Sequence, residues 1–232
     1  LLNRYNSVAN AKTIIENFNK KDIDLIIGTH KILTNQLDLS NVGLLIIDEE
    51  HRFGVMHKEK IKEIKQSVDV LTLSATPIPR TLQMSLLGIH NLSQIETAPL
   101  NRMPVQTYVM KKDKKIIQEI IERELGRNGQ VFYLHNKTTD INSVAYQLEK
   151  KIPGAKVVVG HGKMDNETIE NAMMKFYNKE ANILVATTII ENGIDIPNAN
   201  TVIIEDANRF GLAQLYQIRG RVGRSDRLGY AY

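Results

Sequence analysis

The sequence predicts an α/β protein made of two lobes, each a mostly parallel sheet flanked by helices. Three observations lead to this prediction. Short apolar runs alternate with amphipathic helical segments in both halves of the chain. A stretch with two prolines, 97–104, separates the halves. Polar and charged residues come directly after the apolar runs, at the strand ends where ligands of open α/β sheets bind.

Composition narrows the class of protein. The chain has 232 residues, of which 42% are hydrophobic and 24% charged, as in soluble globular proteins. No apolar run approaches the ~18 residues that span a membrane, so we expect no membrane partner. The absence of cysteine excludes disulfides and cysteine-ligated zinc and fits a cytoplasmic location. The net charge of +4 permits nucleic-acid binding without requiring it.

The first lobe is expected to cover residues 1–98. Ser7 resembles a helix N-cap, because apolar residues at helical spacing follow it as far as Phe18. The remaining expected elements are strands at 24–28, 43–48 and 70–73 and helices at 56–66 and 79–87. The run Leu44 to Ile47 is unbroken and apolar, which favours a strand buried on both faces.

Residues 99–104 are expected to form a linker, and 105–232 the second lobe. Asp113 is the expected cap of the first helix in this lobe. Further helices are expected at 141–152, at 165–176 and at 212–224, with strands at 130–134, 156–159, 183–186 and 201–204.

The most informative stretch lies at the end of the 43–48 strand, where Asp48, Glu49, Glu50 and His51 follow the apolar run. In a nucleoside triphosphatase, an aspartate here holds Mg²⁺ through water and a glutamate orients the attacking water. Glu50 and His51 would lie at the edge of that site and couple it to neighbouring segments. A solvated acidic turn is an equal alternative for this stretch alone.

Ser74 and Thr76 follow the next strand and should therefore lie at the same edge of the sheet. Their hydroxyl groups could hydrogen-bond a carboxylate or a loop backbone and so couple the site to the chain. Taken alone, this segment is better explained as a helix N-cap.

The second lobe ends with Gln217, Arg221 and Arg224, which would share one face of a helix. Two glycines within that helix, Gly220 and Gly223, would each cost about 1 kcal/mol, so we expect them to allow the close approach of another surface. Arginines presented together suit a polyphosphate, and we favour an arginine finger over a basic surface helix.

Other segments carry weaker signals. Thr187 and, in the first lobe, Thr29 and His30 follow strands where they could contact nucleic-acid phosphates. Gly193 and Asp195 could approach a nucleotide ribose. A P-loop, Gly-x-x-x-x-Gly-Lys-Ser/Thr, occurs nowhere in the chain, because 162–163 lack both the upstream glycine and the following hydroxyl residue.

Taken together and in this order, the motifs resemble those of superfamily 2 helicases with two RecA-like lobes. The resemblance runs from Gly28-Thr29-His30 through Asp-Glu-Glu-His and Ser-Ala-Thr to the Gln-x-x-Gly-Arg-x-Gly-Arg segment. Segments 48–55 and 75–82 resemble the RecG-like branch of that superfamily. Segments 57–59 and 224–232 resemble the members of that branch that act on stalled RNA polymerase.

This resemblance implies an ATP-driven translocase on double-stranded DNA that displaces stalled RNA polymerase and couples transcription to nucleotide excision repair. It implies ATP and Mg²⁺ as cofactors, and RNA polymerase and excision-repair proteins as partners through modules outside this chain. It also implies a bacterial, cytoplasmic protein. A RecG-type fork-remodelling helicase and a non-catalytic DNA- or protein-binding module remain as alternatives.

The resemblance implies a role for each candidate residue. Asp48 and Glu49 serve Mg²⁺ and water, and Arg221 and Arg224 with Gln217 lie near the γ-phosphate. Gly193 and Asp195 lie on the nucleotide side. The phosphate backbone is contacted by Thr29, His30 and Thr187. We expect the first lobe to be truncated at its N-terminus and the second at its end. Because the P-loop is absent, we also expect the chain alone to bind ATP weakly and to be inactive.

Overall fold

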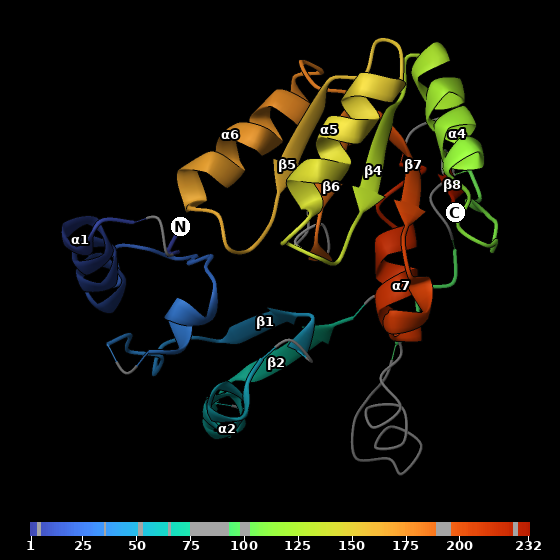
Figure 1. Cartoon of the computed structure of the whole chain (residues 1–232). Helices are drawn as coiled ribbons and strands as arrows, with labels where there is room; N and C mark the ends of the chain where they lie inside the picture. Colours follow the sequence, from blue (N-terminus) through green and yellow to red (C-terminus); the bar gives the residue numbers. More distant parts are fainter. Residues whose placement is uncertain are drawn as a thin grey trace. The chain divides into compact units, whose positions relative to one another are not determined.

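The chain forms two compact units, Leu1–Leu92 and Ser93–Tyr232, and each is described by itself (Figure 1). The computed structural model describes residues 1–3, 6–34, 36–50, 53–64, 66–74, 93–97, 103–188, 196–224 and 227–232, with the backbone only at 166. The expected lobe limits, 1–98 and 105–232 with a linker at 99–104, stay a prediction, because most of the linker lies outside these residues.

Unit 1 contains a parallel pair of strands. Its elements are α1 (Val8–Asn19), the 3₁₀ helix η1 (His30–Leu33), β1 (Leu44–Asp48), α2 (Val55–Ile64) and β2 (Asp69–Leu73). Strands β1 and β2 pair from Leu44↔Asp69 to Asp48↔Leu73. Their carboxyl ends therefore meet at one edge of the sheet. The expected helix at 79–87 lies outside the described residues.

Strand β1 is where expected, but the prediction that it is buried on both faces was wrong. Ile47 is 4% exposed, whereas Leu44 and Ile46 are each 55% exposed. Leu44 and Ile46 point to one face of the strand and Ile47 to the other, so only the face with Ile47 is covered at this point. Burial on both faces requires a layer against each of them.

The prediction of a strand at 24–28 was also wrong. Among the described residues this segment makes only an isolated bridge, Leu2 to Gly28, closed by hydrogen bonds from Leu2 N to Ile27 O and from Thr29 N to Leu2 O. A Cβ atom on Gly28 would lie 2.3 Å from the Leu2 carbonyl oxygen, so this close approach requires glycine. The segment is apolar, but the described part of unit 1 offers it no partner strand with which to extend the ladder.

Unit 2 is built on a six-stranded parallel sheet in the order β3-β8-β7-β4-β6-β5 (Figure 1). Its strands are β3 (Gln106–Thr107), β4 (Gln130–Leu134), β5 (Val157–Gly160), β6 (Ile183–Ala186), β7 (Ala199–Ile204) and β8 (Tyr230–Ala231). Its helices are α4 (Lys114–Gly126), α5 (Ile141–Lys151), α6 (Asn166–Tyr177), η4 (Ala207–Arg209) and α7 (Leu212–Arg219). The two-residue strands β3 and β8 were not expected from the sequence.

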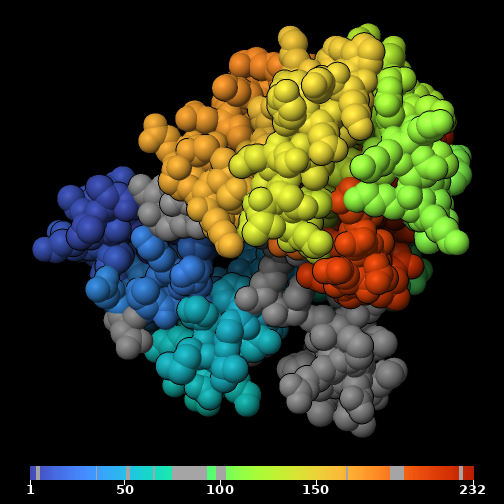
Figure 2. All heavy atoms as spheres, in the orientation of Figure 1, coloured from blue at the N-terminus to red at the C-terminus, as the bar shows by residue number. Residues whose placement is uncertain are grey.

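The core of unit 2 lies on both faces of this sheet. Strand β4 is buried throughout and alternates between the faces. Phe132 and Leu134 pack with residues of α6 and α7, whereas Val131 and Tyr133 pack with residues of α4 and α5. In the space-filling view, side chains of α4 and α5 cover the strands behind them (Figure 2). Because all six strands are parallel, their carboxyl ends lie at one edge of this sheet.

The sequence placed most helix starts of unit 2 correctly. Asp113 caps α4 by accepting hydrogen bonds from the backbone N–H groups of Lys115 and Ile116, at 2.7 and 3.3 Å. Asp165 caps α6 in the same way through Thr168 N, at 2.8 Å. These carboxylates satisfy N–H groups that have no partner inside the helix.

The last helix is shorter than expected. We predicted a helix over 212–224, but α7 ends at Arg219, with Gly220 as its C-cap. Gly223 has a φ of +69°, which ends helical geometry, and a Cβ atom on it would lie 3.0 Å from Val105 Cγ2. Gly223 also lies close to Gly229, because a Cβ atom on Gly229 would lie 2.8 Å from Gly223 Cα. The surfaces that approach Gly223 closely therefore belong to unit 2 itself.

Candidate nucleotide and nucleic-acid site

The acidic pair lies at the carboxyl edge of the unit 1 sheet. Asp48 is the last residue of β1 and is exposed, and Glu49 follows with a φ of +54°. A left-handed backbone is unfavourable for a residue with a Cβ atom, and such conformations gather at functional sites. The Glu49 N–H donates to Leu73 O at 2.9 Å, so the backbone turn is tied to the end of β2.

Ser74 joins the acidic pair as predicted from its position after the next strand. Its hydroxyl donates to Glu49 Oε2 at 3.5 Å, a long hydrogen bond between the ends of β1 and β2. Glu50 is half-buried beside Glu49. His51 and Thr76, the other predicted coupling residues, lie outside the described residues.

Thr29 and His30 begin the helix η1, where Thr29 is the N-cap residue. The His30 ring lies 5.2 Å from the His57 ring of α2, and the Phe53 ring lies 6.1 Å from His57. His30 therefore packs against α2 through aromatic contacts that the sequence had not revealed. Thr29 and His30 are both exposed, so both can reach a ligand.

Thr187 directly follows β6, at the carboxyl edge of the unit 2 sheet. Its N–H donates to Gly160 O at 3.3 Å, and the preceding carbonyl, Ala186 O, accepts from His135 N at 2.9 Å. The half-buried Thr187 thus lies beside the ends of β5 and β4. Gly193 and Asp195 lie outside the described residues.

Gln217, Arg221 and Arg224 do not share one helical face, because α7 ends between the first and the second of them. Gln217 is in α7, Arg221 lies in the turn after it, and Arg224 is exposed beyond Gly223. The Arg224 Nε donates to Gly220 O at 3.2 Å, which directs this side chain back along the turn. The expected helical face is replaced by a helix end followed by a turn.

Within the part of the chain that the structure describes, no group of three or more histidine, aspartate or glutamate side chains is placed to hold a metal ion. Asp48 and Glu49 do offer oxygen ligands at an open strand edge, the donor type that Mg²⁺ prefers. These two carboxylates fit a magnesium ion that takes its other ligands from water and phosphate.

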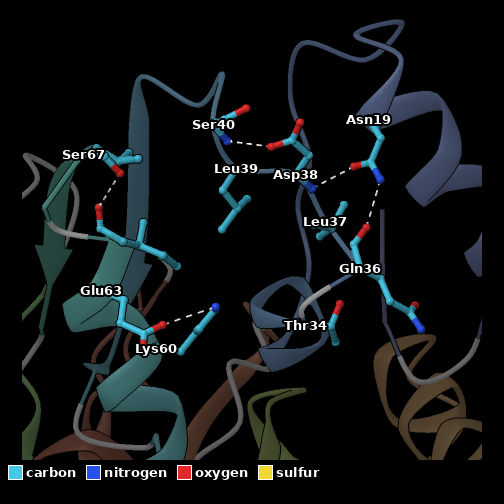
Figure 3. A pocket seen from close by; sticks show the side chains of 12 residues that line it. Asn19, Thr34, Gln36, Leu37, Asp38, Leu39, Ser40, Lys60, Glu63 and Ser67 are labelled. Carbon is cyan, nitrogen blue, oxygen red and sulfur yellow. Dashed lines mark hydrogen bonds and ion pairs between the residues drawn. The ribbon is translucent and has the colours of Figure 1, made fainter.

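A cavity of about 650 Å³ in unit 1 lies at the opposite edge, next to the residues that precede β1 and β2. Figure 3 shows Asn19, at the end of α1, joined to the segment 36–38: its Nδ2 donates to Gln36 O at 2.9 Å and its Oδ1 accepts from Asp38 N at 2.8 Å. Lys60 and Glu63 of α2 form an ion pair of 3.3 Å at its rim. None of the predicted site residues lines this cavity.

Two family models match the chain. Residues 3–85 match the DEAD/DEAH box helicase family, and residues 111–226 match the helicase conserved C-terminal domain. The chain therefore belongs to the helicases that carry this C-terminal domain, and its units have the RecA-like fold of their two lobes.

The curated relatives narrow the kind of helicase further than the two family models do. The chain is 55% identical over all 232 residues to the transcription-repair-coupling factor of Staphylococcus aureus (strain USA300), and 54% identical to that of Staphylococcus epidermidis. It spans 20% of the length of each of these relatives.

Two solved helicase structures have a fold similar to that of this chain. RecG bound to a three-way DNA junction is 34% identical, with a TM-score of 0.71 over 99% of this chain and 31% of that one. The Mycobacterium smegmatis helicase Lhr, bound to single-stranded DNA and AMP-PNP, is 18% identical with a TM-score of 0.72 over 99% of this chain and 33% of that chain. The second likeness supports the fold alone. No helix among the described residues is long and apolar enough to cross a membrane.

Proposed function

We propose that this chain is the motor region of an ATP-dependent translocase on double-stranded DNA that displaces stalled RNA polymerase and couples transcription to nucleotide excision repair. The observation that carries the proposal is the 55% identity to transcription-repair-coupling factors over the whole chain. RNA polymerase and excision-repair proteins would be its partners. Its site of action would be the bacterial cytoplasm.

In this proposal the acidic pair serves ATP hydrolysis. Asp48 holds Mg²⁺ through water, and Glu49 orients the attacking water. The support is their place at the open edge of the sheet and the hydrogen bond that ties Glu49 to Ser74. Ser74 and Glu50, with His51 and Thr76, couple this site to neighbouring segments.

The second lobe would supply the groups that complete the site. Arg221 and Arg224, with Gln217 beside them, stabilise charge at the γ-phosphate, and Gly193 and Asp195 contact the nucleotide. Thr29, His30 and Thr187 contact the DNA backbone: Thr29 and His30 from the start of η1 and Thr187 from the end of β6. Hydroxyl, imidazole and backbone N–H groups suit this role.

Glu49→Gln in the full-length protein tests the central role. The substitution keeps the size of the side chain and removes its charge, so we expect ATP turnover to fall by orders of magnitude while ATP binding persists. DNA-stimulated phosphate release and binding of a fluorescent ATP analogue measure the two effects. Glu59→Gln, an exposed glutamate of α2, is the matched control. Undiminished hydrolysis would remove Glu49 from this role.

Arg224→Ala tests the second lobe in the same assay. An arginine finger contributes about 10³-fold or more to turnover, so we expect a loss of that order with little change in ATP binding. Arg227→Ala, three residues further, is the control, because the Arg227 guanidinium donates to Arg127 O at 3.0 Å and is not a proposed finger. Equal losses in both variants would contradict a specific role for Arg224.

The chain alone, which lacks a P-loop, should not release phosphate from ATP when DNA is added. A measurable DNA-stimulated rate from the purified 232-residue chain would contradict this proposal.

RecG-type fork remodelling is the second candidate, favoured by the 34% identity to RecG bound to a three-way junction. Two assays with the full-length protein separate the candidates: displacement of a stalled transcription complex and regression of a branched DNA fork. A protein that retains the fold but neither hydrolyses ATP nor moves DNA would instead be a binding module.

A further inference from the structure

Five polar side chains from different segments meet at the carboxyl edge of the unit 2 sheet. Tyr133 lies in β4, His135 directly follows it, and Glu205 directly follows β7. Lys112 precedes α4, and Asp140 is the N-cap residue of α5. We call this group the His135 cluster. It includes no residue that the sequence had suggested for the site.

The hydrogen bonds of His135 define its charge. Its Nδ1 bonds Glu205 Oε2, and its Nε2 bonds Asp140 Oδ1 at 2.9 Å. An ionised carboxylate only accepts hydrogen bonds, so each ring nitrogen must donate. A neutral imidazole can donate from one nitrogen only. Both bonds together require the doubly protonated, positively charged ring.

We infer that His135 is a buried imidazolium that positions the loop 136–139 beside Thr187, so that DNA binding at this edge weakens when His135 loses its proton. The DNA part of this inference rests on the proposed function, whereas the charge of His135 does not. His135 is a positioning residue: it acts through the loop and through the strand ends that it joins.

The remaining charges of the cluster favour this state. Glu205 Oε1 accepts from Lys112 Nζ and from the Tyr133 hydroxyl, each at 2.5 Å. Burial would favour neutral Glu205, but the bonds from Lys112, Tyr133 and His135 together hold the pKa of its carboxyl below the usual value. Burial likewise opposes charge on His135, but the bonds to Asp140 and Glu205 outweigh it and raise the pKa of the imidazole. Tyr133, with its pKa raised by burial and by Glu205, stays protonated.

The location of His135 links this charge to the strand ends. Its backbone N–H donates to Ala186 O at 2.9 Å, directly before Thr187, and Glu205 N donates to Leu134 O at 3.1 Å. Asp140 closes the far end of the loop, and its pKa is lowered mainly by the hydrogen bond from His135, with a smaller contribution from the charge of the exposed Lys137. The imidazolium therefore ties both ends of the loop to the ends of β4 and β7.

The sign of the pH dependence follows from the raised pKa of His135. The stabilisation is fully present below the unfolded value, about pH 6.5, and is lost as pH rises through the higher folded value. Glu205 and Asp140 have lowered pKa values in the folded protein, so their charged forms stabilise it above the unfolded values. This stabilisation is lost as the pH falls through the folded pKa values. The cluster should contribute most between these limits.

The direct test is an NMR titration of the whole 232-residue chain with ¹⁵N-labelled histidine. We expect one imidazole with both nitrogens protonated at about pH 7, above the ordinary pKa of about 6.5, and its absence in His135→Gln. Asp140→Asn should lower the pKa of that imidazole, a response that a purely space-filling histidine would not give. Asp206→Asn, next to Glu205 and in an exposed 3.6 Å pair with Arg209, is the control and should leave it unchanged. A neutral His135 at about pH 6 would overturn the inference.

Thermal unfolding provides a second measurement. At about pH 6, His135→Gln should lower the Tm of unit 2 by several degrees, and the difference from the wild type should shrink as pH rises towards about 9. A difference that is the same at both pH values would contradict the charged state. If His135→Gln does not fold, the wild-type titration above still decides the question.

The positioning role is tested in the full-length protein by anisotropy of a labelled DNA duplex at constant salt. The wild type should bind several-fold more tightly than His135→Gln at about pH 6, with a ratio near one at about pH 9. An equal ratio at both pH values would overturn the positioning role. Absence of DNA binding at any pH would instead refute the proposed function, and the NMR titration would still report the charge of His135.

Discussion

Strands β1 and β4 are both five-residue, mainly apolar strands of parallel sheets, yet their surroundings differ. Every residue of β4 is buried, and its side chains alternate between a cluster with α6 and α7 and a cluster with α4 and α5. In β1 only Ile47 is buried. An apolar strand thus shows that a sheet forms, whereas the burial it achieves depends on the layers packed against it.

The largest effect on stability should come from truncating Phe132 in β4. Its ring is fully buried and lies 5.3 Å from the Phe176 ring of α6. Phe132→Ala should lower the free energy of unfolding of unit 2 by about 3–5 kcal/mol. The chain has no tryptophan, and all of its eight tyrosines except Tyr5 lie in unit 2, so tyrosine fluorescence in urea reports on this unit.

The matched change in unit 1 is Ile46→Ala, at a side chain that is 55% exposed. Its cost should be under about 1 kcal/mol, because little apolar area is removed from a buried site. Hydrogen exchange of the β1 amides measures it. Similar costs for both variants would remove the proposed contrast between the two strands.

Gly229→Ala should have an effect smaller than that of Phe132→Ala and larger than that of Ile46→Ala. The added Cβ atom would lie 2.8 Å from Gly223 Cα and 3.3 Å from Val105 Cγ2, so the backbone must shift. We expect a loss of about 1–3 kcal/mol in urea unfolding. Gly43→Ala is the control in unit 1, because no atom lies within 4 Å of a Cβ atom at that position. A neutral Gly229→Ala would show that this turn is loosely packed.

The helix caps should give effects of about 1 kcal/mol or less. Asp113→Ala removes the acceptor for two N–H groups of α4 and should cost about 1 kcal/mol. Ser7→Ala removes one 3.2 Å bond to Asn10 N in α1, which has no buried residue, and should cost about 0.5 kcal/mol or less. Circular dichroism during urea unfolding checks both. A larger loss for Ser7→Ala would mean that α1 depends more on its cap than α4 does.

Local patterns predicted the elements whose apolar residues face a packed layer. Strands β4 and β6 begin and end where the sequence placed them, and the caps Asp113 and Asp165 mark their helices. Position after a strand also placed Glu49 next to Ser74, because the carboxyl ends of parallel strands share an edge.

Elements that depend on distant partners could not be predicted in this way. Among the described residues, the segment 24–28 pairs only through an isolated bridge to Leu2, and β3 and β8 are too short to carry a pattern. The end of α7 depends on how Gly223 packs against Gly229. The His135 cluster depends on the register of β4 and β7, which brings His135 to Glu205 although about seventy residues separate them.

The pairing of β3 with β8 affects how unit 2 folds during synthesis on the ribosome. Gln106 pairs with Tyr230, so about 120 residues must be synthesised between the two halves of this contact. At about 5–20 residues per second, β3 waits on the order of ten seconds without its neighbour. During that time the segment after it, with Val109 and Met110 exposed even in the folded state, is open to other chains. Strand β3 can therefore join the sheet only after β8 has been synthesised.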